Sequence, residues 1–134
     1  MIVQGKDVCS WVAEKANIYV NEHCQGIGYL SEGKLIAGVS YERYTGKSIM
    51  VHQRVDSSAP RGFWFAAVDY PFNDLGVSHL LGLVDSTNQK AIKINLKMGF
   101  KIEATIADAG SNGEDLLIMK MSKENCKLLN WGKK

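Results

Sequence analysis

The sequence predicts a mixed α+β fold in which most strands are antiparallel, one pair is parallel, and helices cover both faces of the sheet. Residues 26–55 contain three consecutive strand-like runs joined by short turns, which is typical of an antiparallel meander. Residues 48–85 then hold a strand, a helical segment and another strand, and such a unit implies a parallel pair. A further helix and two strands follow.

The first half of the chain begins with a short strand expected at residues 2–3. Asp7 would cap a helix that runs to about Asn17. Three strands follow at residues 26–31, 34–44 and 48–55. Alternation along the last strand places His52 and Val55 on opposite faces of the sheet.

The second half alternates helices with strands. Residues 56–76 open with serines and a proline, carry bulky apolar residues at helical spacing, and are expected to stop near Pro71 and Gly76. The remaining elements are a strand at residues 78–85, a helix from Asn88, and two strands at residues 100–109 and 115–121. A Ser-Asn-Gly turn joins the last two strands.

Composition excludes several classes of function. The chain has 134 residues, 46% of them apolar and 22% charged, and we expect a single domain over residues 1–134. A net charge of +2 without a clustered basic face argues against a nucleic-acid partner. The N-terminal residues contain no apolar segment long enough for a signal peptide or a membrane span, so we expect a cytoplasmic protein with no membrane partner.

The cysteines Cys9, Cys24 and Cys126 are odd in number and have no paired spacing. This pattern fits neither a disulfide framework nor a zinc site, so the sequence predicts buried thiols and no metal.

The segment around the helix from Asn88 combines four informative residues. Asn88 suits a helix N-cap, and Ala91 lets the helix pack closely on a sheet. Gly99 can adopt the left-handed conformation that ends a helix, after which Phe100 enters the core. All four are therefore explained by structure alone.

The same four residues, with their spacing and the strands on either side, resemble the second motif of the GNAT superfamily of acyl-CoA-dependent N-acyltransferases. The order of elements along the whole chain is also similar to that family. The resemblance implies a mostly antiparallel sheet of about six to seven strands, with the parallel pair splayed apart. It further implies acetyl-CoA or another acyl-CoA as cosubstrate, a primary amine on an unknown acceptor, and a structure compatible with a homodimer. Residues 64–91 also look like small acetyltransferase-like proteins of phages and bacteria.

The resemblance assigns cofactor contacts to residues 61–66, the position of the family's pyrophosphate loop. These residues are Arg61, Gly62, Phe63, Trp64, Phe65 and Ala66. Arg61 and Ala66 fit the loop, but Trp64 replaces its middle glycine and Gly62 lies two places early. We expect Trp64 to turn into the core, and at least two of the three aromatic residues to be core residues.

Two further cofactor contacts follow from the resemblance. Val55 would offer the backbone amide that polarises the thioester carbonyl. Asn88 either caps its helix alone or also contacts the pantetheine arm, and both interpretations remain open.

The resemblance also points to residues for the chemistry. Asn95 stands where many members of the family place a tyrosine that protonates the leaving thiolate. An amide is not a general acid, so Asn95 would hydrogen-bond the sulfur or hold a water, or else the proton would come from Tyr70 or from solvent. His52 and Glu42 are the candidates for the base that accepts the proton of the amine. The alternatives are a histidine with a structural role and a solvated ion pair between Glu42 and Arg43.

Two functions from different classes are compatible with these residues. The first is an active N-acyltransferase. The second is a GNAT-fold protein that has lost catalysis and binds or inhibits a partner, for example a viral protein directed at a host factor. Trp64 and Asn95 favour the second function, whereas the residues from Asn88 to Phe100 fit both. An unrelated α+β domain with similar helix ends is a third interpretation.

Overall fold

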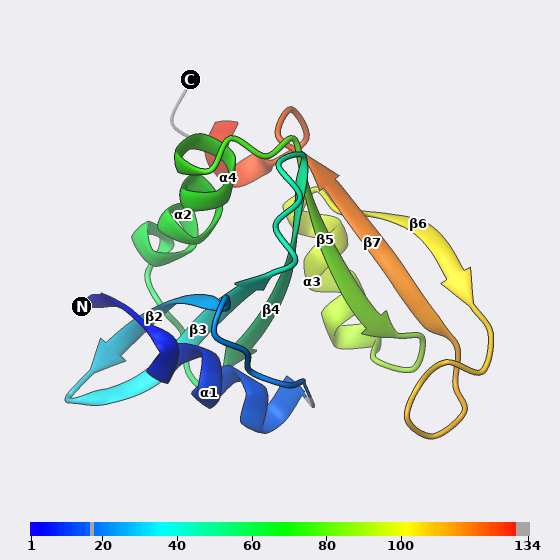
Figure 1. Cartoon of the computed structure of the whole chain (residues 1–134), viewed down its shortest axis with the longest axis horizontal. Coiled ribbons are helices and arrows are strands. Elements are labelled where there is room, and N and C mark those ends of the chain that lie inside the picture. Colours follow the sequence, from blue (N-terminus) through cyan, green and yellow to red (C-terminus); the bar gives the residue numbers. More distant parts are fainter. Residues whose placement is uncertain (17, 131–134) are drawn as a thin grey trace.

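The computed structural model describes residues 1–16 and 18–130, which form a single twisted sheet with helices packed on it (Figure 1). The strands of this described part are β1 (Ile2–Gln4), β2 (Gln25–Ser31), β3 (Lys34–Glu42), β4 (Ser48–Val55), β5 (His79–Asp85), β6 (Lys101–Ile106) and β7 (Leu116–Ser122). The helices are α1 (Lys6–Ala16), α2 (Arg61–Asp69), the π-helical turn η1 (Tyr70–Asp74), α3 (Gln89–Met98) and α4 (Lys127–Asn130).

The seven strands of the described chain lie in the order β1-β2-β3-β4-β5-β7-β6. Neighbouring strands are antiparallel except β4 and β5, which are parallel. The connection between these two strands contains α2 and η1, as a parallel crossover requires. The predicted fold class, a mostly antiparallel sheet with one parallel pair and helices on both faces, is confirmed.

Helix α1 lies alone on one face of the sheet, across β2 to β4 (Figure 1). It sits very close to the strands, because the positions beneath it are Gly26, Gly28 and Gly38. A Cβ atom built on Gly26 would lie only 2.9 Å from the Cβ of Val8. Small residues in the strands therefore set the distance between this helix and the sheet.

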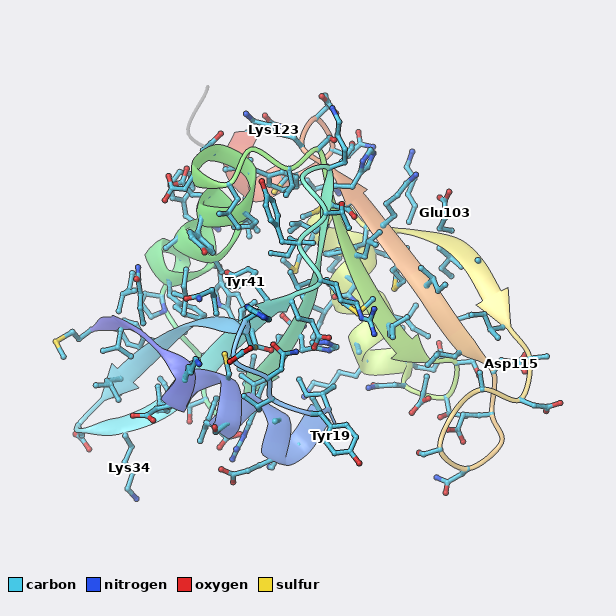
Figure 2. All side chains as sticks on the ribbon, viewed as in Figure 1. Tyr19, Lys34, Tyr41, Glu103, Asp115 and Lys123 are labelled. Carbon is cyan, nitrogen blue, oxygen red and sulfur yellow. The ribbon has the colours of Figure 1, made fainter. Side chains whose placement is uncertain are left out.

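Helices α2 and α3 cover the opposite face. Phe63 of α2 packs edge-on against Tyr29 of β2, with ring centroids 6.1 Å apart. Asn95 of α3 contacts Met119 of β7. Side chains fill the space between the sheet and these helices (Figure 2), and the main hydrophobic core lies there.

The end of α2 is shaped by Pro71. In a regular helix the N–H of residue 71 would donate to the carbonyl of Ala67, but proline has no N–H group. The hydroxyl of Tyr41 on β3 donates to that carbonyl instead. The chain then widens into η1, where the N–H of Leu75 donates to the carbonyl of Tyr70 at 3.0 Å. The predicted stop between Pro71 and Gly76 agrees with this arrangement.

Helix α3 has the N-cap and the C-terminal glycine that the sequence predicted. The Asn88 side chain accepts a hydrogen bond from the N–H of Ala91 at 3.2 Å. Gly99 ends the helix with φ of 120°, and Phe100 is buried.

Several predicted boundaries differ from the structure. Helix α1 begins at Lys6, so Asp7 lies in the first helical turn and is not the N-cap. Asn17, the predicted end of that helix, is outside the described residues. Strand β3 ends at Glu42, two residues early, because Arg43 turns the chain with φ of 56°. Helix α4 was not predicted.

The three cysteines are buried and free, as predicted. No helix in the described part of the chain is both long and apolar enough to cross a membrane.

The contact between Tyr41 and Ala67 predicts a measurable loss of stability. Tyr41→Phe removes the hydroxyl that donates to the buried carbonyl of Ala67, and loss of such a hydrogen bond costs about 0.5–1.5 kcal/mol. Tyr44→Phe is the matched control, because its exposed hydroxyl donates to the carbonyl of Leu75 at 3.2 Å and water can replace it. Urea unfolding should therefore show a clearly lower free energy of unfolding for the first variant only. Equal stability of the two variants would contradict this account of the end of α2.

Candidate functional site

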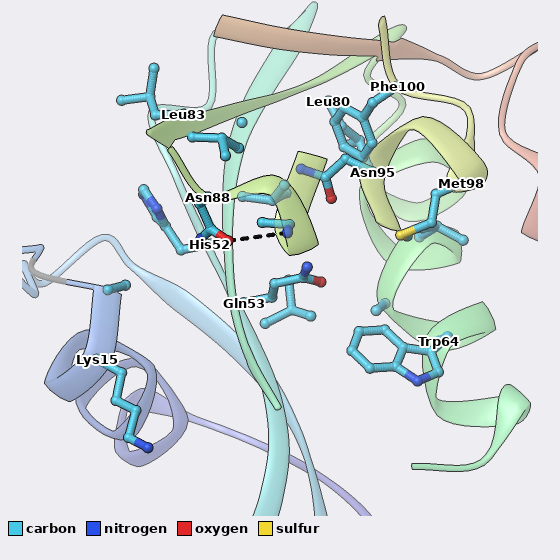
Figure 3. A pocket seen from close by; sticks show the side chains of 18 of the residues that line it. Lys15, His52, Gln53, Trp64, Leu80, Leu83, Asn88, Asn95, Met98 and Phe100 are labelled. Atoms are coloured by element: carbon cyan, nitrogen blue, oxygen red, sulfur yellow. Dashed lines mark hydrogen bonds between the residues drawn. The ribbon is translucent and has the colours of Figure 1, made fainter. Parts of the chain in front are cut away.

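The parallel strands β4 and β5 are paired over only three positions. The Cα partners are Ser48 with His79, Ile49 with Leu80, and Met50 with Leu81. Beyond them the strands diverge, and a cavity of about 290 Å³, here called the central cavity, opens between their C-terminal halves (Figure 3). The predicted splay of the parallel pair is confirmed, and the opening lies where ligands of such sheets usually bind.

Backbone N–H groups of β4 point into this opening. The N–H of Asp56 donates to the carbonyl of Ile36 on β3 at 2.7 Å. Because N–H directions alternate along a strand, those of Gln53 and Val55 point away from β3, towards β5. No residue of β5 pairs with Gln53 or Val55 in the described structure. These two donors are therefore available to a ligand that enters the opening.

The central cavity reaches both faces of the sheet. Trp64 of α2 and Asn95 of α3 line it on one face (Figure 3). His52 of β4 and the end of α1, represented by Lys15, line it on the other face. Two molecules can therefore approach the same point from opposite sides.

A second hollow, here called the basic cleft, adjoins the central cavity on the face of α2 and α3. It has a volume of about 730 Å³ and shares Gln53, Trp64 and Met98 with the central cavity. Four cationic side chains line it, and none of its lining residues in the described chain is acidic; the cations are Arg61, Lys90, Lys97 and Lys127. A polyanion would be favoured there.

The basic cleft was not predicted from the sequence. Lys90 and Lys97 are seven residues apart and so share one face of α3, which is a pattern that the sequence displays. Lys127 comes from α4, and only the folded chain brings it beside them.

His52 and Glu42 form a close, largely shielded pair. The Nε2 atom of His52 lies 3.0 Å from Oε2 of Glu42, and their side chains are only 10% and 15% exposed. Burial lowers the pKa of His52 below its usual 6.5, and this effect outweighs the opposing influence of Glu42. A neutral His52 then donates through Nε2–H to the carboxylate and keeps Nδ1 as a basic nitrogen.

Of the two candidates for the base, only His52 lines the central cavity. Glu42 lines a separate groove and reaches the cavity through its hydrogen bond to His52. Oε1 of Glu42 lies 3.8 Å from Nε of Arg43. Because the Glu42 side chain is only 15% exposed, this contact is not a solvated ion pair on the surface.

Tyr70 is positioned away from the central cavity. It lines the separate groove with Glu42, and its ring packs edge-on against Tyr41 at 5.3 Å between centroids. Burial, with a smaller effect of Asp74, raises the pKa of Tyr70. Tyr70 is therefore not placed to protonate a group beside Asn95.

The aromatic residues at the start of α2 point in three directions. Phe63 is fully buried, whereas Phe65 is 39% exposed. Trp64 is half-buried and lines both the central cavity and the basic cleft (Figure 3). Phe63 belongs to the core, and Trp64 packs against the core and against the Phe63 ring, with centroids 4.8 Å apart, while another part of it lines the cavity. Successive residues of a helix are rotated by about 100°, so three neighbours cannot all face the core, and Phe65 is the exposed one.

The rest of the predicted phosphate loop forms the first turns of α2. Arg61 is exposed, begins the helix and lines the basic cleft. The N–H of Phe63 donates to the carbonyl of Pro60 at 3.0 Å, so the N–H group of Gly62, in the first turn, is one that the helix start can offer to a ligand. Ala66 lies beyond the first turn, where backbone N–H groups are used within the helix.

The remaining candidates lie around the opening. Asn88 caps α3 and also lines the central cavity, so its structural role leaves room for a ligand contact. Val55 is 49% exposed at the end of β4 and lines the basic cleft. Asn95 is buried and lines the central cavity. Among the described residues, no group of three or more His, Cys, Asp or Glu is placed to hold a metal ion.

Solved structures provide a close comparison for this arrangement. The spermidine/spermine N-acetyltransferase SpeG from Vibrio cholerae, in complex with manganese ions, superposes with a TM-score of 0.73 at 16% identity, over 98% of this chain and 96% of that chain. The chain has the GNAT fold. The IAA acetyltransferase from Bacillus cereus ATCC 14579, also similar, gives a TM-score of 0.69 at 14% identity, over 91% of this chain and 99% of that chain. No protein-family model and no curated protein sequence matches the chain significantly.

The buried His52 predicts a pH dependence of folding. Its pKa is lowered in the folded protein, so the unfolded chain binds more protons once the pH falls below about 6.5. The free energy of unfolding should decrease there, by at most about 1.4 kcal/mol per pH unit for one proton. His52→Gln should remove this part of the decrease, whereas His23→Gln, at an exposed site, should not. Urea unfolding at pH 7.5 and 5.5 tests this, and equal pH dependence of wild type and His52→Gln would contradict it.

Proposed function

We propose that this protein is an N-acyltransferase that moves an acetyl or other acyl group from an acyl-CoA to a primary amine. The observation that carries the proposal is the opening between β4 and β5. It has free N–H donors on its edge, a basic cleft on one side and a neutral histidine on the other. Fold similarity to acetyltransferases supports the same reaction class.

The residues of the basic cleft fit coenzyme A. Coenzyme A carries a pyrophosphate and a further phosphate, and Arg61, Lys90, Lys97 and Lys127 supply four cations for them. The start of α2 adds the N–H group of Gly62 and the positive end of the helix dipole. The pantetheine arm then passes Trp64 along the edge of β4, where Val55 in the basic cleft and Gln53 beside the central cavity offer their N–H groups.

The reaction follows from the arrangement of donors and base. The N–H of Val55 or Gln53 polarises the thioester carbonyl, and the amine nitrogen attacks its carbon from the face of α1. A C–N bond forms and the C–S bond breaks, with the bonding electron pair leaving on sulfur. His52 accepts the proton that the nitrogen loses, and Glu42 stabilises the imidazolium that results.

The leaving thiolate takes its proton from water in this scheme. Asn95 has no acidic proton to give, and Tyr70 lines a different groove. A thiolate is a moderately good leaving group, because the pKa of a thiol is only about 8.5. Transfer therefore does not depend on a side-chain acid.

A binding protein without catalysis is the second candidate function, and Trp64 favours it. Its ring lies between the basic cleft and the central cavity, where the family's loop has a glycine. In that case coenzyme A or a partner would be bound, but no acyl group would be transferred.

Calorimetric titration with coenzyme A tests the proposal. We expect wild type to bind, and Lys90→Glu and Lys97→Glu each to weaken binding by roughly 10- to 100-fold, since a charge-assisted contact contributes about 1.5–3 kcal/mol. Lys34→Glu, at the start of β3 and outside the basic cleft, is the control that should leave the affinity unchanged. Absence of binding by wild type would exclude both the transferase and a coenzyme A-binding protein.

Release of free thiol from acyl-CoA in the presence of primary amines, including spermidine, separates the two functions. His52→Gln should lower kcat/KM by about 10²- to 10⁴-fold while leaving the dissociation constant for coenzyme A unchanged. Wild type that binds coenzyme A but transfers to none of the amines would favour the binding protein.

A further inference from the structure

The glycine in the middle of β5, Gly82, is not explained by the fold. A Cβ atom built there would meet no other atom within 4 Å, although the residue is buried, and its φ is not in the left-handed region. Glycine inside a strand costs about 0.5–1 kcal/mol relative to alanine. The glycines beneath α1 allow a close helix, but no helix approaches Gly82 in that way. The remaining reason for glycine in a strand is the close approach of a ligand.

The empty space beside Gly82 belongs to the central cavity and lies under α3. Ala91 and Asn95 are four residues apart, so they share the helical face that lines the cavity opposite β5. Met119 is the cross-strand partner of Gly82 and contacts Asn95. This part of the cavity, bounded by Gly82, Ala91 and Asn95, is here called the Gly82 recess.

One polar atom of a largely buried side chain faces the recess without a partner among the described residues. The Asn95 side chain is only 9% exposed. Its amide nitrogen donates to the Met119 sulfur at 3.6 Å, and a thioether is a weak acceptor. Its carbonyl oxygen has no hydrogen-bond partner among the described residues and points into the cavity (Figure 3). Once a ligand fills the recess and keeps water from this oxygen, leaving it unpaired costs about 1–3 kcal/mol, and an N–H or O–H group on the ligand would satisfy it.

The recess lies on the side from which the proposed donor enters. It opens on the face of α2 and α3, as the basic cleft does, whereas His52 faces α1. The cavity residues around it include the apolar Leu80, Val84 and Phe100. No cationic side chain of the described chain lines the central cavity on this face, so the recess does not suit a phosphate. The part of an acyl-CoA that fits an apolar recess beyond the thioester is the acyl chain.

We propose that the Gly82 recess holds an acyl chain longer than acetyl, and that this chain carries a hydroxyl or amide N–H that donates to the carbonyl of Asn95. The inference rests on the proposed function, because it names the acyl donor of that same site. Gly82 then determines the length of the chain that fits, and Asn95 selects for a hydrogen-bond donor on it.

Titrating the protein with four ligands tests this assignment: coenzyme A, acetyl-CoA, butyryl-CoA and 3-hydroxybutyryl-CoA. For wild type we expect 3-hydroxybutyryl-CoA to bind roughly 10-fold more tightly than butyryl-CoA. The reason is that butyryl-CoA has no hydroxyl on its acyl chain and therefore leaves the Asn95 oxygen unpaired. Asn95→Leu, which has a similar size and no polar atom, should remove this difference without weakening coenzyme A itself.

Gly82→Val provides a second variant that does not alter Asn95. Valine suits a strand, so the melting temperature should be unchanged or higher. The two four-carbon donors should bind at least 10-fold more weakly, while coenzyme A and acetyl-CoA bind as they do to wild type. Leu81→Val is the matched control, because Leu81 is the neighbouring residue on the same strand and does not line the central cavity.

Several outcomes would overturn the assignment. Equal affinity of wild type for the plain and hydroxylated four-carbon donors would exclude a donor facing Asn95. A loss of coenzyme A affinity in Asn95→Leu would show that Asn95 contacts the thiol and not the acyl chain. Unchanged binding of all four ligands by Gly82→Val would exclude the recess as the acyl site. In each case wild type still binds coenzyme A. Failure of the proposed function is seen separately, either as absence of binding of all four ligands or, where they bind, as absence of transfer to any amine.

Discussion

The early end of the pairing between β4 and β5 is the constraint on which the candidate site depends. Strand β4 keeps β3 as its partner along its length, up to the pair Ala37–Val55. Strand β5 instead keeps β7, from His79 to Asp85. Each strand is therefore held on its outer side while only three positions join them to each other. Since a sheet strand cannot satisfy its backbone groups without a partner, this gap is a natural place for an extended ligand.

The helices that cover the gap are held by contacts outside it. Tyr41 replaces the hydrogen bond that Pro71 cannot make, so the end of α2 is anchored to β3. Asn88 and Gly99 fix the two ends of α3. The gap is thereby lined by the starts of helices and by rigid strands, which favours precise placement of a bound group. Separation of the basic cleft from His52 by the sheet also keeps the proposed donor and acceptor on opposite sides.

The elements with strong local patterns could be predicted from the sequence. These elements are the three strands at residues 26–55, the parallel pair, and the two ends of the helix after Asn88. They depend on alternating apolar residues, turn residues and helix caps, which act over a few neighbouring residues. The direction of Trp64 could not be predicted in this way. Three consecutive aromatic residues all favour burial, and Phe63 occupies the core because it meets Tyr29 from a distant strand.

The same limit applies to the site. His52 could be proposed from its place on a strand, but its shielding by Glu42 depends on the register between β3 and β4. Tyr70 is only 18 positions from His52 in the sequence, yet the π-helical turn after α2 places it in another groove. The basic cleft combines residues of β4, α2, α3 and α4, and no local pattern contains that information.

The most direct test of the account is to observe the backbone of β4 while coenzyme A is added to the ¹⁵N-labelled protein. Amide resonances of Gln53, Val55, Arg61 and Gly62 should shift strongly, because their N–H groups line the opening and begin α2. Resonances of β1 and of the groove around Tyr70 should remain in place. Shifts confined to that groove, or no shifts at millimolar coenzyme A, would contradict the claim that the gap between β4 and β5 is the acyl-CoA site.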